Sequence, residues 1–87
     1  MSTQMDNLIR LLELLASQKR DEMGTAWMVN NNVQAALGLS PAVVNDAVSL
    51  ADSRGYVEVR KVMGTSLYTF HSITINAEGR MWLEKQE

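Results

Sequence analysis

The chain has 87 residues, of which 46% are hydrophobic, and a formal net charge of −2. This length fits one domain with one hydrophobic core, and a charged fraction of 21% argues against a disordered chain. The absence of cysteine excludes a disulfide framework and a thiolate metal site, and the negative charge counts against strong non-specific affinity for DNA.

No internal repeat or linker interrupts the sequence, so we expect residues 1–87 to form a single domain, with residues 1–5 disordered. No stretch reaches the length of a membrane span, and the N-terminus lacks the basic and then apolar layout of a signal peptide. We therefore expect a cytoplasmic protein without a membrane partner.

The first predicted element is an amphipathic helix that begins after Asp6, a residue suited to an N-cap. Ile9 and Leu14 flank its apolar stripe and widen it, and Lys19 and Arg20 suit its C-terminus because cations are favoured there. The stripe has the helical spacing of three and four residues and consists of Leu8, Leu11, Leu12 and Leu15.

Two shorter elements are predicted next. Residues 25–29 form an apolar run that we interpret as a brief strand. Asn30 is a candidate N-cap for a short helix over residues 31–37, and Gly38 stands where helices commonly end in glycine.

The Ser40-Pro41 pair is the clearest local signal, because serine at an N-cap and proline at the first helical position both favour a helix start. We expect a third helix over residues 41–54, ended by Gly55. Together with the second helix it predicts a helix-turn-helix. Its apolar side comprises Val43, Val44, Ala47, Val48, Leu50 and Ala51, and its outward side Ala42, Asn45, Asp46, Ser49, Asp52 and Ser53.

The remaining segment predicts two strands and a last helix. Residues 56–62 and 67–75 are rich in β-branched and aromatic side chains. Between them Gly64-Thr65 fits a two-residue turn with glycine first. Asn76 is a candidate N-cap for a helix over residues 77–86.

Two stretches carry a resemblance to a known family. "LSPAVVNDAVSLADSRGYVEV" (residues 39–59) resembles the recognition helix and first wing strand of MarR-, ArsR- and PadR-type regulators, and "ITINAEGRMWLE" (residues 73–84) resembles the segment that closes their wing. The resemblance implies an α+β winged helix-turn-helix fold, with a three-helix core, a β-hairpin wing and a C-terminal helix. It also implies a transcriptional regulator that binds double-stranded DNA as a dimer.

The resemblance places the third helix in the DNA major groove and the wing on the backbone or in the minor groove. Asparagine can pair with adenine through two hydrogen bonds, whereas a solvated helix face without a ligand is the plain alternative. Family members usually carry several cations on this helix, but here Asp46 and Asp52 share the face. The candidate DNA-binding residues are Asn31, Ala42, Asn45, Ser49, Arg60 and Lys61.

Other candidate sites are few. Ile9, Leu14 and Trp82 are candidate homodimer contacts, because apolar residues outside a core stripe are costly to leave in water. We interpret Trp27 as core filling and His71, the only histidine, as a structural strand residue. No catalytic residue, metal site or cofactor is predicted, so we expect no enzyme.

Two further functions stay open beside DNA binding. A winged helix can serve as a protein-protein interaction module without binding DNA, and the acidic outward face of the third helix favours this alternative. A ligand-responsive switch is the third possibility, with a small molecule bound in a dimer cleft.

Overall fold

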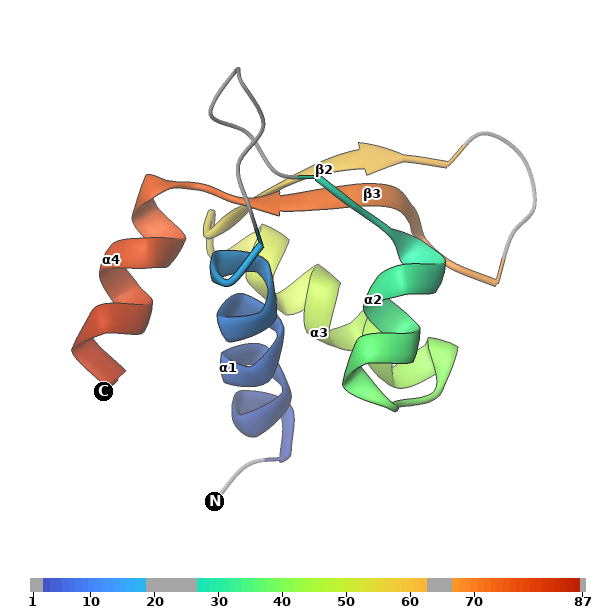
Figure 1. The fold of residues 1–87 in the computed structure, drawn as a ribbon, viewed down its shortest axis with the longest axis horizontal. Helices are drawn as coiled ribbons and strands as arrows, with labels where there is room; N and C mark the ends of the chain where they lie inside the picture. The colour runs from blue at the N-terminus through green and yellow to red at the C-terminus, as the bar shows by residue number, and fades with distance from the viewer. Residues whose placement is uncertain (1–2, 19–26, 63–66, 87) are drawn as a thin grey trace.

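The computed structural model describes residues 3–18, 27–62 and 67–86, and its elements follow one another in the predicted order. The α+β class is therefore confirmed. Within the described ranges no helix is both long and apolar enough to cross a membrane. The elements, shown in Figure 1, are α1 (Thr3–Ala16), β1 (Met28–Val29), α2 (Asn30–Leu37), α3 (Pro41–Ser53), β2 (Val57–Lys61), β3 (Phe70–Ile75) and α4 (Ala77–Gln86).

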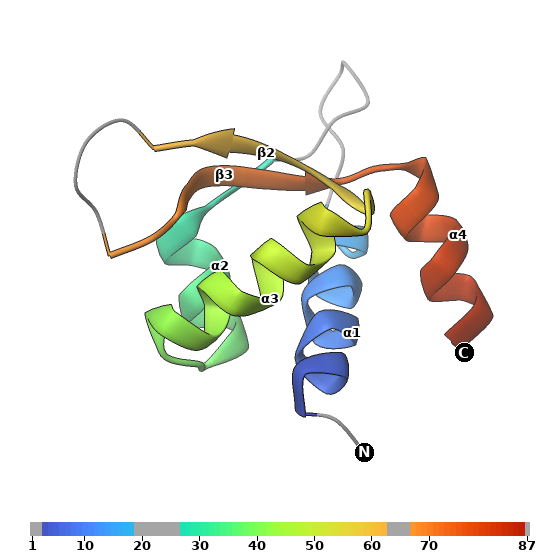
Figure 2. The same ribbon diagram turned by 180° about the vertical axis from the view of Figure 1, so that it is seen from behind.

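The three strands form an antiparallel sheet in the order β1-β3-β2, and the helices lie on one side of it (Figures 1 and 2). The core fills the space between these two layers, and the predicted leucine stripe of α1 is almost completely buried in it. Its buried members are Leu8, Leu11, Leu12, Leu15, Val33, Leu37, Val44, Ala47, Val48, Ala51, Val57, Phe70, Ile73, Ile75 and Leu83.

Helix α1 begins earlier than predicted. Its first residue is Thr3, so residues 3–5 are helical rather than disordered, and Asp6 lies in the first turn instead of at the N-cap. Met5 packs against the core, and this contact extends the helix toward the N-terminus. The carboxylate of Asp6 still suits its position, because anions are favoured in the first turn of a helix.

The same helix ends before the two cations that were expected at its C-terminus. The Ser17 hydroxyl and the Gln18 amide both donate to the carbonyl of Leu14, at 2.7 and 3.0 Å. These bonds add to the one that the Leu14 carbonyl accepts from the Ser17 backbone amide at 3.3 Å, so side chains help to satisfy the last turn. Lys19 and Arg20 lie outside the described residues.

The turn between α2 and α3 follows the predicted local signals. Gly38 has a φ of 67°, in the left-handed region that glycine adopts without steric cost. The Ser40 side chain accepts a hydrogen bond from the Val43 amide, with Pro41 next in the chain. Helix α2 begins at Asn30, one residue before the prediction, and the Asn30 side-chain nitrogen donates to the Phe70 carbonyl of β3 at 3.0 Å. Local capping signals cannot predict this long-range bond.

Strands β2 and β3 are shorter than predicted, because Tyr56, Val62 and residues 67–69 lie outside the ladder. The register shifts near their far ends, where Arg60 faces Ser72 but Lys61 faces Phe70. His71 is therefore the extra residue of a bulge, which turns Phe70 into the core beside Ile73. The predicted Gly64-Thr65 turn lies outside the described residues.

Helix α4 follows β3 through the predicted cap. The Asn76 side chain accepts a hydrogen bond from the Gly79 amide at 2.9 Å and donates one to the Gly55 carbonyl at 2.8 Å. Gly79 is buried against the carbonyl of Tyr56. These contacts fix the start of α4 to the end of α3, and the helix runs beside α1 (Figure 1).

Candidate functional site

The outward side of α3 is exposed, as the sequence predicts. Ala42 and Ser49 are exposed, together with Asp46 and Asp52. On the apolar side Val43 is half-buried, and the buried residues are Val44, Ala47, Val48 and Ala51. The exposed side chains are short, so a partner can approach the helix backbone closely. Asn31, in the first turn of α2, is also exposed.

The charge of this surface is unusual for a face that meets phosphate. Residues 27–53, which include α2 and α3, contain no lysine, arginine or histidine and carry two aspartates. The cations that follow this stretch in the chain are Arg54, Arg60 and Lys61, all exposed. The backbone amide of Asn31 already donates to the Asn30 side chain at 2.7 Å. An anion at the start of α2 would therefore have to compete for this donor.

Asn45 is engaged within the fold. Its side-chain nitrogen donates to the Leu67 carbonyl at 2.8 Å, and its side-chain oxygen accepts from the Thr69 backbone amide at 3.0 Å. Both ends of the carboxamide thus hold the segment that leads into β3. Pairing with an adenine edge needs the same two groups, so base reading would require these bonds to break.

We predict that Asn45→Ala loosens this segment from α3. Two exposed hydrogen bonds contribute about 1 kcal/mol together, so exchange of the Thr69 amide hydrogen should accelerate roughly fivefold relative to the parent chain. Hydrogen-exchange NMR measures this directly. Asn45→Asp is the matched control, because it keeps an acceptor for Thr69 and loses the donor to Leu67. Unchanged protection at Thr69 in Asn45→Ala would show that the two hydrogen bonds of Asn45 are not formed in solution.

Arg60 and Lys61 project to opposite faces of the sheet, as neighbouring residues of a strand do. The Lys61 ammonium approaches Asp52 of α3 at 3.9 Å, and both side chains are well exposed. The Arg60 guanidinium carbon lies 4.1 Å from the centroid of the Trp27 ring, on the face away from the helices. The two cations therefore do not form one phosphate clamp, although each remains accessible to an incoming partner.

Trp27 does not fill the core as predicted. It is partly buried but lies outside the core cluster, whereas its neighbour Met28 packs against that cluster. Alternation along the short strand β1 explains the difference, and the sequence carried this signal in the spacing of Trp27 and Val29. Val29 is 41% exposed on the same side.

The candidate dimer residues are only partly available. Ile9, Leu14 and Trp82 are all half-buried and pack against the core of their own chain. The Trp82 ring also stacks on Tyr56, with centroids 5.0 Å apart. The exposed apolar side chain on α4 is Met81, at 54%. Much of the apolar area assigned to a dimer contact is thus already covered within one chain.

One buried polar residue escaped the sequence interpretation. Asn7 is only 8% exposed and, with Gln4, borders a hollow between α1 and α3. An asparagine among leucines on a helix gives no signal that it faces a cavity.

In comparisons with known proteins, neither a protein-family model, nor a curated protein, nor a solved structure matches this chain.

Proposed function

We propose that the chain is a winged helix-turn-helix domain that binds double-stranded DNA and regulates transcription. Helix α3 is then the recognition helix and the β2–β3 hairpin is the wing. The observation that carries this proposal is the exposed face of α3, with short side chains at Ala42 and Ser49. Exposed Arg54 follows this helix in the chain, and Lys61 of β2 approaches its Asp52. Its support from the fold is the tight turn between α2 and α3.

In this arrangement the outward face of α3 from Ala42 to Ser49 enters the major groove and the cations stay at the phosphate backbone. Ser49 can donate to or accept from a base edge, and Ala42 can contact a thymine methyl group. Asp46 disfavours phosphate and can accept from a cytosine amino group. We therefore expect the protein to discriminate among bases, although its few cations attract the DNA backbone only weakly.

The small number of cations predicts an unusually shallow salt dependence. If Arg54, Arg60 and Lys61 each release one counterion, the logarithm of the binding constant should fall with the logarithm of salt with a slope of about −3 per protomer. Fluorescence anisotropy on labelled duplexes, starting near 50 mM salt, measures this slope. Replacing any one of the three by alanine should reduce it by about one.

Lys85→Ala on α4 is the matched control, because it removes the same charge far along the chain from the proposed interface. Its slope should equal that of the parent chain. No binding at low salt, or an equal effect of Lys85→Ala, would contradict the DNA proposal.

A homodimer is the second part of this proposal, because two copies are needed to read a two-fold symmetric operator. The candidate contacts are Ile9, Leu14 and Trp82, extended by the exposed Met81. Sedimentation of the chain at high micromolar concentration tests this, and a monomer there would rule the dimer out.

A protein-protein interaction module is the second candidate function. The specific observation in its favour is the lack of cations over residues 27–53, with Asp46 and Asp52 exposed. A partner with a basic surface would complement this face. A stable protein partner that is lost in Asp46→Lys, together with no DNA binding near 50 mM salt, would decide for this function.

A further inference from the structure

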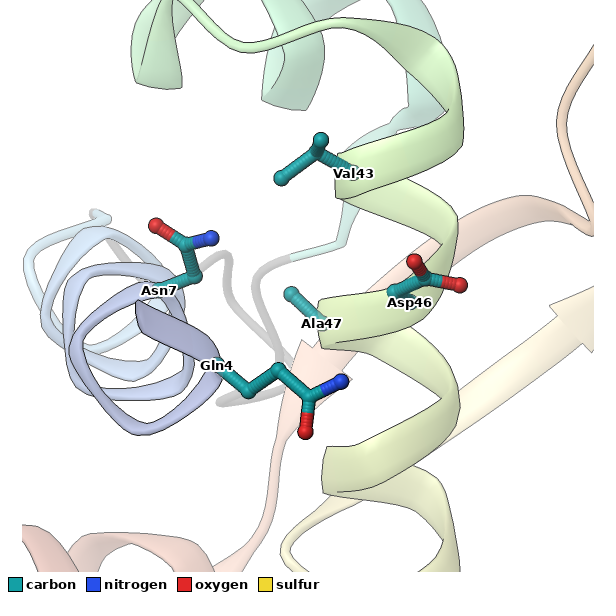
Figure 3. Close-up of a pocket in the computed structure, with 5 residues that line it drawn as sticks. All are labelled: Gln4, Asn7, Val43, Asp46 and Ala47. Atoms are coloured by element: carbon teal, nitrogen blue, oxygen red, sulfur yellow. The ribbon is translucent and has the colours of Figure 1, made fainter. Parts of the chain in front are cut away.

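A hollow of about 160 Å³ opens between the N-terminal halves of α1 and α3. Figure 3 shows Asn7 of α1 opposite Val43 and Ala47 of α3, with Gln4 extending across the gap. Asp46 stands at the rim, and its carboxylate turns away from α1 in this view. An engineered apolar cavity of about 150 Å³ holds a benzene ring, so this space suits a molecule of similar cross-section.

Asn7 is the feature that points to a ligand. The residue is 8% exposed, yet no hydrogen bond joins its side chain to another residue in the ranges 3–18, 27–62 and 67–86. In these ranges no side-chain nitrogen or oxygen is both sealed from solvent and without a partner, so the amide of Asn7 still reaches solvent through the hollow. A group that pairs with it there gains a hydrogen bond in a largely apolar site.

We propose that this hollow binds a small neutral molecule with an apolar body and a carboxamide head. A carboxamide matches Asn7 because each group offers one acceptor and two donor hydrogens, so the two can pair in both directions. Val43 and Ala47 supply the apolar wall. A charged head group is disfavoured because it would lose hydration in this site. An anion would in addition lie near Asp46. This inference does not rest on the proposed DNA binding, although Asp46 belongs to both surfaces.

Benzamide is the probe that tests the proposal, with benzamidine and benzoate as isosteric cation and anion. Titration of the ¹⁵N-labelled chain should shift the side-chain amide resonances of Asn7, with a dissociation constant on the order of 1 mM, as expected for about nine heavy atoms. Benzamidine should bind less tightly and benzoate least. Equal binding of benzoate, or no shift with benzamide on the order of 10 mM, would overturn the proposal.

Two variants separate binding from folding. Asn7→Leu removes the amide with little change of volume, so the protein should stay folded while the benzamide dissociation constant rises about tenfold or more. Asn32→Leu, at an exposed position of α2, is the matched control and should bind as the parent does. Val43→Phe fills the hollow and should block binding with Asn7 still in place. Parent-like affinity in Asn7→Leu or Val43→Phe would contradict the assigned site.

Discussion

Gly79→Ala is expected to lower the free energy of unfolding by about 2 kcal/mol, although alanine favours helix more than glycine does. A Cβ at this position would overlap the carbonyl oxygen of Tyr56 and come within 2.8 Å of Ile75 Cγ1. The carbonyl cannot yield easily, because it accepts a hydrogen bond from the Asn76 amide at 3.1 Å. Relief of the overlap must therefore move the start of α4 away from the sheet.

Urea unfolding followed by circular dichroism measures this loss. Glu78→Ala is the matched control, because it changes an exposed residue in the same turn and should stay within about 0.5 kcal/mol of the parent chain. A Gly79→Ala variant as stable as the parent would show that α4 does not pack this closely in solution.

Phe70→Ala is expected to cost about 3–5 kcal/mol, the largest effect of a single substitution that we predict. The side chain is fully buried and lies edge-to-face with Tyr68, at 6.1 Å between ring centroids. Domains of this size have a total stability of about 5–15 kcal/mol, so the variant should be only marginally folded.

Thermal unfolding of Phe70→Ala and Phe70→Leu distinguishes burial from the loss of one aromatic contact. The leucine variant fills much of the space and should retain most of the stability. Leu67→Ala, at a residue 76% exposed three positions earlier, should change the free energy of unfolding by no more than about 0.5 kcal/mol. A small effect of Phe70→Ala would mean that the bulge at His71 does not turn this ring inward.

Local signals in the sequence were sufficient wherever one short stretch determines the geometry. The leucine spacing of α1, the Ser40-Pro41 start of α3 and the cap at Asn76 each depend on residues a few positions apart. The same holds for Gly38, since its left-handed backbone follows from the chemistry of one residue. These predictions are confirmed.

Apart from Trp27, whose placement follows from strand alternation, the predictions that failed depend on contacts between distant residues. The ends of β2 and β3 follow from a register shift at His71, which no local pattern encodes. Asn30 entered α2 instead of capping it, with its side-chain nitrogen bonded to Phe70, forty positions away.

In the candidate site, too, local features were predictable from the sequence and long-range contacts were not. Exposure of Ala42 and Ser49 followed from the helical period of α3. The bonds of Asn45 to Leu67 and Thr69 cross from helix to hairpin, and only the folded chain brings these groups together. The ring contact of Arg60 with Trp27 likewise spans the width of the sheet.

The two bonds of Asn45 have a consequence for the speed of association. They tie α3 to the entry of β3, so the surface presented to a partner that leaves Asn45 in place is pre-organised before an encounter. The ordering entropy of this segment is lost during folding rather than during binding. Association should therefore proceed without a slow rearrangement step, with a rate that rises in proportion to partner concentration.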